Sequence, residues 1–283
     1  MKNILLTGSG GFIGSHLKNH LKGRYNLLTP RSCELNLCDK NAVKDYFGKN
    51  SIDFIIHSAS LGVRIMPDAL MKEVAKPNTE MFRNLADFAV KNRPMITFGS
   101  GAEYDKSRPL HKIKEEDFGK RIPKDPYGYS KYMISKEIEM RENILSLRLF
   151  GIYGAGEDKS RVTSCIINST LERKPVILNQ NVIFDFIWVE DFCKITEFFI
   201  NNKTEEKFIN VTPSESIETV KLAQIACGFS DFKSEIIVKK EGMNKEYTGS
   251  NEKLLKIMPD FTFTSYKDGM KQFFMIKEAQ KTC

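Results

Sequence analysis

Short apolar runs and longer amphipathic segments alternate along the first half of this chain. The apolar runs have the length and composition of buried strands and lie at 2–6, 25–29, 53–57, 95–98 and 144–149. The segments between them repeat their apolar positions with helical spacing, at about 13–22, 40–48, 76–92 and 127–142. Strands that alternate with helices form parallel sheets, so the pattern predicts an α/β fold with a doubly wound parallel sheet.

A glycine-rich turn joins the first of these strands to the first helix. Its sequence, T-G-S-G-G-F-I-G from Thr7 to Gly14, follows the apolar run 2–6 directly. Such glycines allow a tight turn, let backbone amides approach a phosphate and permit close packing of helix and strand, while the helix N-terminus adds partial positive charge. Three glycines can also simply close a loop, but their place between strand and helix favours nucleotide binding. The residues expected to contact the nucleotide are Gly8, Gly10, Gly11, Phe12, Ile13 and Gly14.

After Gly154 the alternation becomes irregular. The later pattern contains a helix near 161–172, an extended piece at 175–178, a strand at 183–188 and a helix from Asp191. A chain of 283 residues can fold as a main domain with a smaller lobe. We therefore expect a Rossmann-type nucleotide-binding domain at 1–154, which the resemblance described below makes an NAD(P)-binding domain. The remainder, 155–283, is expected to form mainly a small C-terminal substrate-binding lobe, with about 183–200 returning to the main sheet.

Composition narrows the class of ligand and the compartment. The 43 Lys and Arg against 36 Asp and Glu give a net charge of +7 without a long basic tract, which favours an anionic ligand over nucleic acid. The six cysteines show no C-x-x-C spacing, and no segment reaches membrane-spanning length or resembles a secretory leader. We expect a cytoplasmic protein with reduced thiols, no metal site and no membrane partner.

Two polar side chains with complementary chemistry open the helix predicted at 127–142. Tyr127 and Lys131 are four residues apart, which places a phenol and an ammonium on one helical face. A free phenol titrates near pH ~10, so it needs a nearby cation before it can exchange a proton at neutral pH. Lys131 could supply that charge, although an ordinary surface pair is the alternative.

A serine follows the strand predicted at 95–98. Ser100 lies in the run F-G-S-G-A-E-Y at the carboxyl end of that strand, and in open parallel sheets this edge holds the ligand crevice. Its hydroxyl could hydrogen-bond a reacting carbonyl or alcohol oxygen. A serine in a tight turn fits the pattern equally well.

Five motifs follow one another along the chain. They are T-G-S-G-G-F-I-G, Ser100, Tyr127-x-x-x-Lys131, R-L-F-G-I-Y-G from Arg148 and D-F-I-W-V-E-D from Asp185. Together they resemble the extended short-chain dehydrogenase/reductase family, in the group that acts on nucleotide-activated sugars, and the similarity extends to about residue 275. The resemblance implies that Ser100, Tyr127 and Lys131 form a catalytic triad. Lys131 would also bind the nicotinamide ribose, Tyr127 would contact the cofactor and transfer the proton, and Ser100 would bind the substrate and orient its reacting oxygen.

The residues after the second strand bear on which dinucleotide binds. Arg31 and Ser32 stand where NAD-specific members of the family carry an acidic residue, and a cation with a hydroxyl suits the 2′-phosphate of NADP. Glu34 is the nearest acid and lies beyond that position, so NADP(H) is preferred and NAD(H) is the alternative. Further residues that the resemblance places at the cofactor are Asn36, Leu37, Ser58, Ala59 and Ser60, and Asn78 would help to hold Lys131.

The residues after Ser100 bear on the reaction. The dehydratase branch of the family carries Asp-Glu directly after its catalytic Ser or Thr, whereas this chain has Gly101 and Ala102, with Glu103 one place too late. A branch that epimerises at C3 and C5 uses an extra cysteine and histidine, and no cysteine comes directly after Ser100. Simple hydride transfer is the reaction that remains.

The function expected from this resemblance is that of an NADP-dependent reductase. It would deliver hydride to C4 of a nucleotide-activated 4-ketosugar, with Tyr127 as the proton donor, in surface-polysaccharide sugar biosynthesis. The first alternative is an NAD-dependent nucleotide-sugar 4-epimerase, whose tightly held cofactor takes up and returns the hydride. The second is a non-catalytic nucleotide-sensing protein of the same fold, which the complete set of Ser100, Tyr127 and Lys131 disfavours.

The substrate side departs from the family's pattern. Phe184 replaces an arginine that contacts the diphosphate in most members, and Gly151 replaces a common asparagine. Other cations would then bind the anion. The candidates are Arg161, Lys245 and Arg64, each of which is otherwise a solvated surface charge.

The resemblance also implies a homodimer. The seam would be a four-helix arrangement formed by the helices near 78–92 and 127–142 of two copies. The apolar residues of the first of these helices are more simply core residues: Phe82, Leu85, Ala86 and Ala89.

Overall fold

The computed structural model describes residues 1–61 and 68–282, and these divide into two compact units. Unit 1 comprises Met1–Ser107, Glu115–Leu149 and Cys193–Asn210. Unit 2 comprises Arg108–Lys114, Phe150–Phe192 and the chain from Val211 on.

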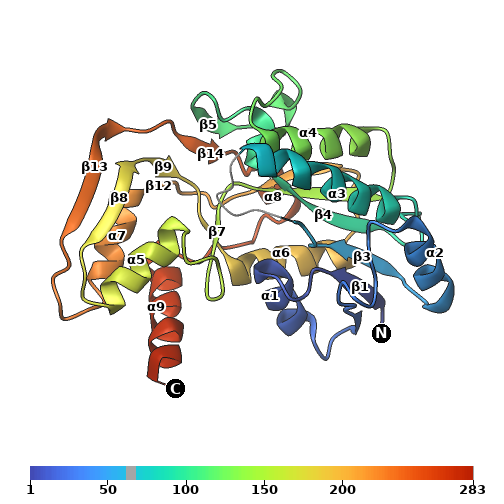
Figure 1. The fold of residues 1–283 in the computed structure, drawn as a ribbon, viewed down its shortest axis with the longest axis horizontal. Coiled ribbons are helices and arrows are strands. Elements are labelled where there is room, and N and C mark those ends of the chain that lie inside the picture. The colour runs from blue at the N-terminus through green and yellow to red at the C-terminus, as the bar shows by residue number, and fades with distance from the viewer. Residues whose placement is uncertain (62–67, 283) are drawn as a thin grey trace. The chain divides into compact units, whose positions relative to one another are not determined.

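The centre of unit 1 is a six-stranded sheet (Figure 1). Its strands are β1 (Asn3–Thr7), β2 (Asn26–Leu28), β3 (Phe54–His57), β4 (Met95–Ser100), β6 (Ile144–Leu149) and β11 (Phe208–Val211). They are arranged in the order β11-β6-β4-β3-β1-β2, and β1–β2, β1–β3, β3–β4 and β4–β6 pair in parallel. The predicted doubly wound parallel sheet is confirmed.

Helices cover this sheet. They are α1 (Phe12–Leu21), α2 (Lys40–Lys49), α3 (Asp68–Ala86), α4 (Pro126–Glu139) and α6 (Val189–Asn201), the last beginning just before unit 1 resumes. The apolar residues of α2, α3 and α4 join one core cluster with β1, β3 and β4, so these helices share a face of the sheet (Figure 1). Phe82, Leu85 and Ala86 belong to that core, and Ala89 packs against it.

Unit 2 is built from smaller sheets and four helices. One sheet has the order β12-β9-β14-β5, a parallel ribbon pairs β13 with β8, and β10 pairs with β7. The strands are β5 (Leu110–Ile113), β7 (Ile152–Tyr153), β8 (Val176–Asn181), β9 (Ile183–Phe184), β10 (Ile187–Trp188), β12 (Ile217–Glu218), β13 (Ile236–Met243) and β14 (Tyr247–Gly249). The helices are α5 (Val162–Leu171), α7 (Thr219–Cys227), α8 (Glu252–Ile257) and α9 (Tyr266–Thr282). Trp188 is buried in the core of this unit.

The two units alternate along the chain. The expected strand at 183–188 is two short strands of unit 2, and the segment that returns to unit 1 is Cys193–Asn210. The segment Arg108–Lys114, which lies between two parts of unit 1 in the sequence, belongs to unit 2 because β5 pairs with β14. The sequence pattern placed the return at about 183–200, whereas the pairing of β5 with β14 has no counterpart in the local hydrophobic pattern.

Candidate active site

Two positions of the glycine turn exclude any side chain. Gly8 has a left-handed φ of +70°, and a Cβ there would lie 2.5 Å from the backbone nitrogen of Ala59. A Cβ on Gly14 would lie 2.1 Å from the carbonyl oxygen of Gly8. The ends of β1 and β3 and the start of α1 therefore pack backbone to backbone. Gly11 is the N-cap of α1 and no side chain of the described residues caps this helix, an arrangement that fits an anion at its first amides.

The cofactor residues predicted after β3 lie beside this turn. The chain proceeds from β1 to β2 on one side and then to β3 on the other, so β1 and β3 flank the switch point of the sheet. The Thr7 hydroxyl lies 2.9 Å from His57 Nδ1 and accepts the amide of Ala59 at 3.4 Å. Burial, and secondly the charge of Lys131, lower the pKa of His57 to about 3, so its ring is neutral at physiological pH. Ser58 and Ser60 flank Ala59 at this edge. These residues fit a dinucleotide with its pyrophosphate at the glycine turn.

The residues expected at the adenosine side follow β2. Arg31 and Ser32 are exposed in the turn after this strand. The Glu34 carboxylate accepts the backbone amide of Arg31 at 2.6 Å, so it is held within this turn. Asn36 is exposed, while Leu37 is buried and its carbonyl accepts the side-chain amide of Asn84 at 2.9 Å.

The three predicted catalytic residues all lie in unit 1. Ser100 ends β4 and is buried, and Tyr127 and Lys131 stand in the first turns of α4. This helix begins at Pro126, and the Asp125 carboxylate caps it by accepting the amide of Gly128 at 2.9 Å.

Two contacts bring the start of α4 against the end of β4. A Cβ on Gly128 would lie 2.6 Å from the carbonyl oxygen of Ala102, so the helix presses on the turn that follows Ser100. The Lys131 ammonium donates to the carbonyl of Phe98 at 2.9 Å. The helix that carries the phenol and the ammonium is thus fixed to the strand that carries the serine.

A second cation lies beside the phenol. Lys106 Nζ is 3.2 Å from the Asp125 carboxylate and 5.8 Å from the centroid of the Tyr127 ring. Sequence reasoning missed this residue, because its place beside α4 depends on the fold of the loop after β4. Asn78, which the resemblance assigns to Lys131, accepts the amide and donates to the carbonyl of Leu61, at 2.7 and 3.0 Å, and its role at Lys131 stays a prediction.

The predicted substrate residues belong to unit 2. Arg161 is the exposed N-cap residue of α5, and Lys245 is exposed in the turn between β13 and β14. Arg64 lies outside the described residues. Their role in substrate binding stays a prediction.

Gly151 and Phe184, the two departures from the family's pattern, pack against each other in unit 2. A Cβ on Gly151 would lie 2.7 Å from a ring carbon of Phe184. Phe184 in turn stacks on Phe186 and on Tyr247, with ring centroids 4.5 and 4.8 Å away. The same Cβ would lie 2.7 Å from the carbonyl oxygen of Asp185, so both the backbone and the Phe184 ring exclude a side chain at position 151.

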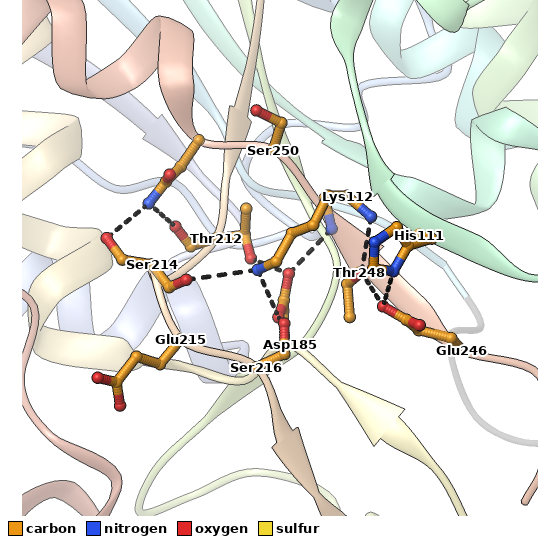
Figure 2. A network of polar contacts seen from close by, with 12 residues as sticks. His111, Lys112, Asp185, Thr212, Ser214, Glu215, Ser216, Glu246, Thr248 and Ser250 are labelled. Atoms are coloured by element: carbon orange, nitrogen blue, oxygen red, sulfur yellow. Dashed lines mark hydrogen bonds and ion pairs between the residues drawn. The ribbon is translucent and has the colours of Figure 1, made fainter.

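A buried carboxylate organises the sheet of unit 2 (Figure 2). Asp185 is fully buried and accepts the hydroxyls of Thr212 and Ser216, each at 2.5 Å, and the amide of Gly249 at 2.9 Å. Lys112 Nζ lies 3.6 Å from it. Burial raises the pKa of Asp185, and the hydrogen bonds and the charge of Lys112 oppose that rise. The contacts hold β5, β14 and the 212–216 segment against β9.

The described residues contain neither a membrane-spanning helix nor a group of metal ligands. No helix among them is long and apolar enough to cross a membrane. Within the same residues, no three His, Cys, Asp or Glu side chains are grouped so that they could hold a metal ion.

Residues 4–212 match the NAD dependent epimerase/dehydratase family, and the chain belongs to this family. It is an enzyme of the extended short-chain dehydrogenase/reductase type that uses a nicotinamide dinucleotide. The glycine turn at the switch point and the Ser100, Tyr127 and Lys131 set are in keeping with this assignment.

Three relatives act on nucleotide-linked sugars according to their names. The ADP-L-glycero-D-manno-heptose-6-epimerase of Brachyspira hyodysenteriae is 24% identical over 260 residues, covering 78% of this chain and 79% of the relative. The GDP-6-deoxy-D-talose 4-dehydrogenase of Aggregatibacter actinomycetemcomitans is 23% identical over 291 residues, covering 96% of both. The solved GDP-mannoheptose C4 reductase of Campylobacter jejuni, with NADP bound, has a TM-score of 0.84 at 17% identity and covers 98% of both chains. This last likeness shows the fold.

Proposed function

We propose that this chain is an NADP-dependent reductase that converts the C4 ketone of a nucleotide-activated 4-ketosugar to an alcohol, for surface-polysaccharide sugar biosynthesis. The observation that carries the proposal is the fixed junction between β4 and α4, where Gly128 packs on Ala102 and Lys131 binds the carbonyl of Phe98. This junction holds Ser100, Tyr127 and Lys131 in the same unit as the glycine turn.

The residues of the chain would handle the reacting oxygen and its proton. When bound, NADPH supplies the hydride to C4. The Ser100 hydroxyl hydrogen-bonds the C4 oxygen, on which negative charge develops, and the Tyr127 phenol donates its proton to that oxygen. The ammonium groups of Lys131 and Lys106 stabilise the phenolate that is left. One hydride and one proton together give the alcohol.

The names of two relatives support C4 of a GDP-linked sugar as the place of reaction. One is a GDP-6-deoxy-D-talose 4-dehydrogenase and the other a GDP-mannoheptose C4 reductase. The run Gly101-Ala102 after Ser100 supports hydride transfer without dehydration. GDP-linked 4-keto sugars therefore come first in a substrate panel, followed by their dTDP-, UDP- and ADP-linked counterparts.

The test of catalysis is NADPH consumption with this panel. Tyr127→Phe should lower kcat by about 100-fold or more, because general acid catalysis contributes at least that factor, while the Kd for NADPH stays unchanged. Tyr129→Phe is the matched control, because Tyr129 is an exposed tyrosine on the same helix. Full activity of Tyr127→Phe with a substrate that wild type reduces would overturn the mechanism.

The cofactor preference has a separate test. Arg31→Ala should raise the KM for NADPH by about tenfold and leave the KM for NADH nearly unchanged, because the guanidinium would bind only the 2′-phosphate. Arg121→Ala, which removes another exposed arginine of unit 1, serves as the control. Equal use of NADH and NADPH by wild type and by Arg31→Ala would contradict the preference.

The alternative is an NAD-dependent nucleotide-sugar 4-epimerase. It is favoured by the name of the family and by a relative that is a heptose epimerase. An epimerase would interconvert two sugar nucleotides without net consumption of cofactor. Product analysis by NMR in the absence of added NADPH distinguishes the two activities.

A further inference from the structure

A fully buried carboxylate lies three residues after Ser100. Glu103 Oε1 accepts the backbone amide of Ser100 at 2.7 Å. Its other oxygen, Oε2, accepts the hydroxyl of Ser135 at 2.6 Å and Nε of Arg148 at 2.7 Å. Both oxygens of this side chain are therefore bound to the protein.

The three partners of Glu103 come from three elements. Ser100 ends β4, Arg148 lies on β6, and Ser135 lies on α4. Ser135 follows Tyr127 and Lys131 at successive four-residue steps, so the three side chains share one face of the helix. The carboxylate thus connects the backbone of the serine to the helix that carries the phenol and the ammonium.

The cation that binds Glu103 is equally buried. Arg148 is fully buried, its Nη1 donates to the Tyr104 hydroxyl at 2.9 Å, and its guanidinium carbon lies 4.1 Å from the centroid of the Phe208 ring. A Cβ on Gly99 would lie 2.7 Å from Glu103 Oε1 and 2.9 Å from Arg148 Cγ, so glycine at this position of β4 leaves room for the pair. Such packing allows the carboxylate little freedom.

The same turn also orients the Ser100 hydroxyl. Ser100 Oγ accepts the amide of Ala102 at 3.1 Å, while the Ser100 amide donates to Glu103, a reciprocal capping box. Because Oγ already accepts one hydrogen bond from the protein, its own hydrogen is left to donate elsewhere.

We propose that Glu103 is a positioning residue for the reduction. Its carboxylate joins Ser100 to Ser135 and so sets the spacing between the serine hydroxyl and the Tyr127 phenol, while Arg148 holds the carboxylate in place. This role rests on the proposed function, because it requires Ser100 and Tyr127 to act on one oxygen. A misplaced catalytic group lowers the rate of the chemical step more than it weakens binding.

The test compares two buried serines. Ser135→Ala removes the hydroxyl that links α4 to Glu103. Ser146→Ala is its control, because Ser135 and Ser146 are each 1% exposed, but Ser146 Oγ has no hydrogen-bond partner among the described residues. Ser135→Ala should lower kcat by about tenfold and leave the substrate KM and the Kd for NADPH within about twofold of wild type. Ser146→Ala should keep the wild-type kcat.

Glu103→Gln gives a second measurement with a larger expected effect. The glutamine side chain has one accepting oxygen, so its NH2 group would have to face either the Ser100 amide or the Arg148 guanidinium, both of which are donors. Its kcat should fall further than that of Ser135→Ala. If Glu103→Gln does not fold, the Ser135 and Ser146 pair still decides.

Each outcome of the comparison is informative. Equal kcat values for Ser135→Ala, Ser146→Ala and wild type, with Tyr127→Phe inactive, would overturn the positioning role and leave the proposed function intact. Equal losses in both serine variants, with matching losses of thermal stability, would show a merely structural effect and also overturn it. A fully active Tyr127→Phe would instead remove the proposed function on which this role rests.

Discussion

Units 1 and 2 each bury a carboxylate completely, and they satisfy it in different ways. Glu103 of unit 1 binds an equally buried guanidinium, one amide and one hydroxyl. Asp185 of unit 2 binds two hydroxyls and one amide, and its lysine lies 3.6 Å away with a side chain that is 36% exposed. The first carboxylate depends on one buried opposite charge, whereas the second shares its charge among neutral donors.

The two carboxylates should differ most in how much stability the protein loses when the neighbouring cation is removed. Arg148→Met leaves Glu103 buried without its opposite charge, and we expect the free energy of unfolding to fall by about 3–5 kcal/mol. Lys112→Met should cost less than about 1 kcal/mol, because Lys112 is partly solvated and the neutral donors of Asp185 remain. Urea unfolding of the two variants measures both values, and equal losses would contradict the distinction.

The next prediction concerns how the free energy of unfolding falls at low pH because of His57. Burial lowers the pKa of His57 in unit 1 from 6.5 to about 3, so between these pH values the unfolded chain binds a proton that the native chain does not. Its contribution to stability is complete above pH 6.5 and falls as the pH drops, by roughly 1.4 kcal/mol per pH unit. His57→Asn removes the titrating group, so the unfolding free energy of this variant should vary less steeply than that of wild type between about pH 6 and pH 4, which lie inside that window. The same slope in both proteins would show that His57 is not the group responsible.

Glu157 of unit 2 should give the opposite slope over a narrower range. Burial raises its pKa from 4.5 to about 7, against a hydrogen bond from the Thr163 hydroxyl. The native chain therefore binds a proton that the unfolded chain does not, and stability falls as the pH rises from 4.5 toward 7. Glu157→Gln should be relatively more stable than wild type at the upper end of this range, as measured by urea unfolding at several pH values. A constant difference between the two proteins would refute this expectation.

A smaller effect than that of Arg148→Met tests how Asp185 shares its charge among its partners. Ser216→Ala removes one of the two hydroxyls that bind it and should cost about 1.5 kcal/mol, as for a hydrogen bond to a charged group. Ser214→Ala is the control in the same segment, because the exposed Ser214 hydroxyl binds Asn251 and not Asp185. A loss as large as that of Arg148→Met would mean that Asp185 also depends on a single partner.

The features that could be predicted from the sequence are those that depend on residues close together in the chain. The main sheet follows from apolar runs that alternate with helical patterns, and Gly8 and Gly14 stand out because their place between a strand and a helix requires glycine. Tyr127 and Lys131 were found through their helical spacing.

Features that depend on distant partners could not be predicted. β5 and β11 are short, and they are placed by β14 and β6. The sequence shows only that Glu103 lies one position beyond the glutamate of the dehydratase branch. Its structural role could not be predicted, because its partners Ser135 and Arg148 lie far along the chain. The departure of Arg108–Lys114 from unit 1 has no local signal either, because the strand in this segment is placed by β14.

The return of β11 to β6 limits how the protein can be shortened. Every residue of β6 is buried, and β11 forms the edge of the sheet beside it. A truncation at residue 154 would keep the glycine turn and the triad but would expose the backbone amides and carbonyls of β6. Unpaired strand edges of this kind recruit other chains. Such a fragment should aggregate instead of yielding a smaller cofactor-binding protein.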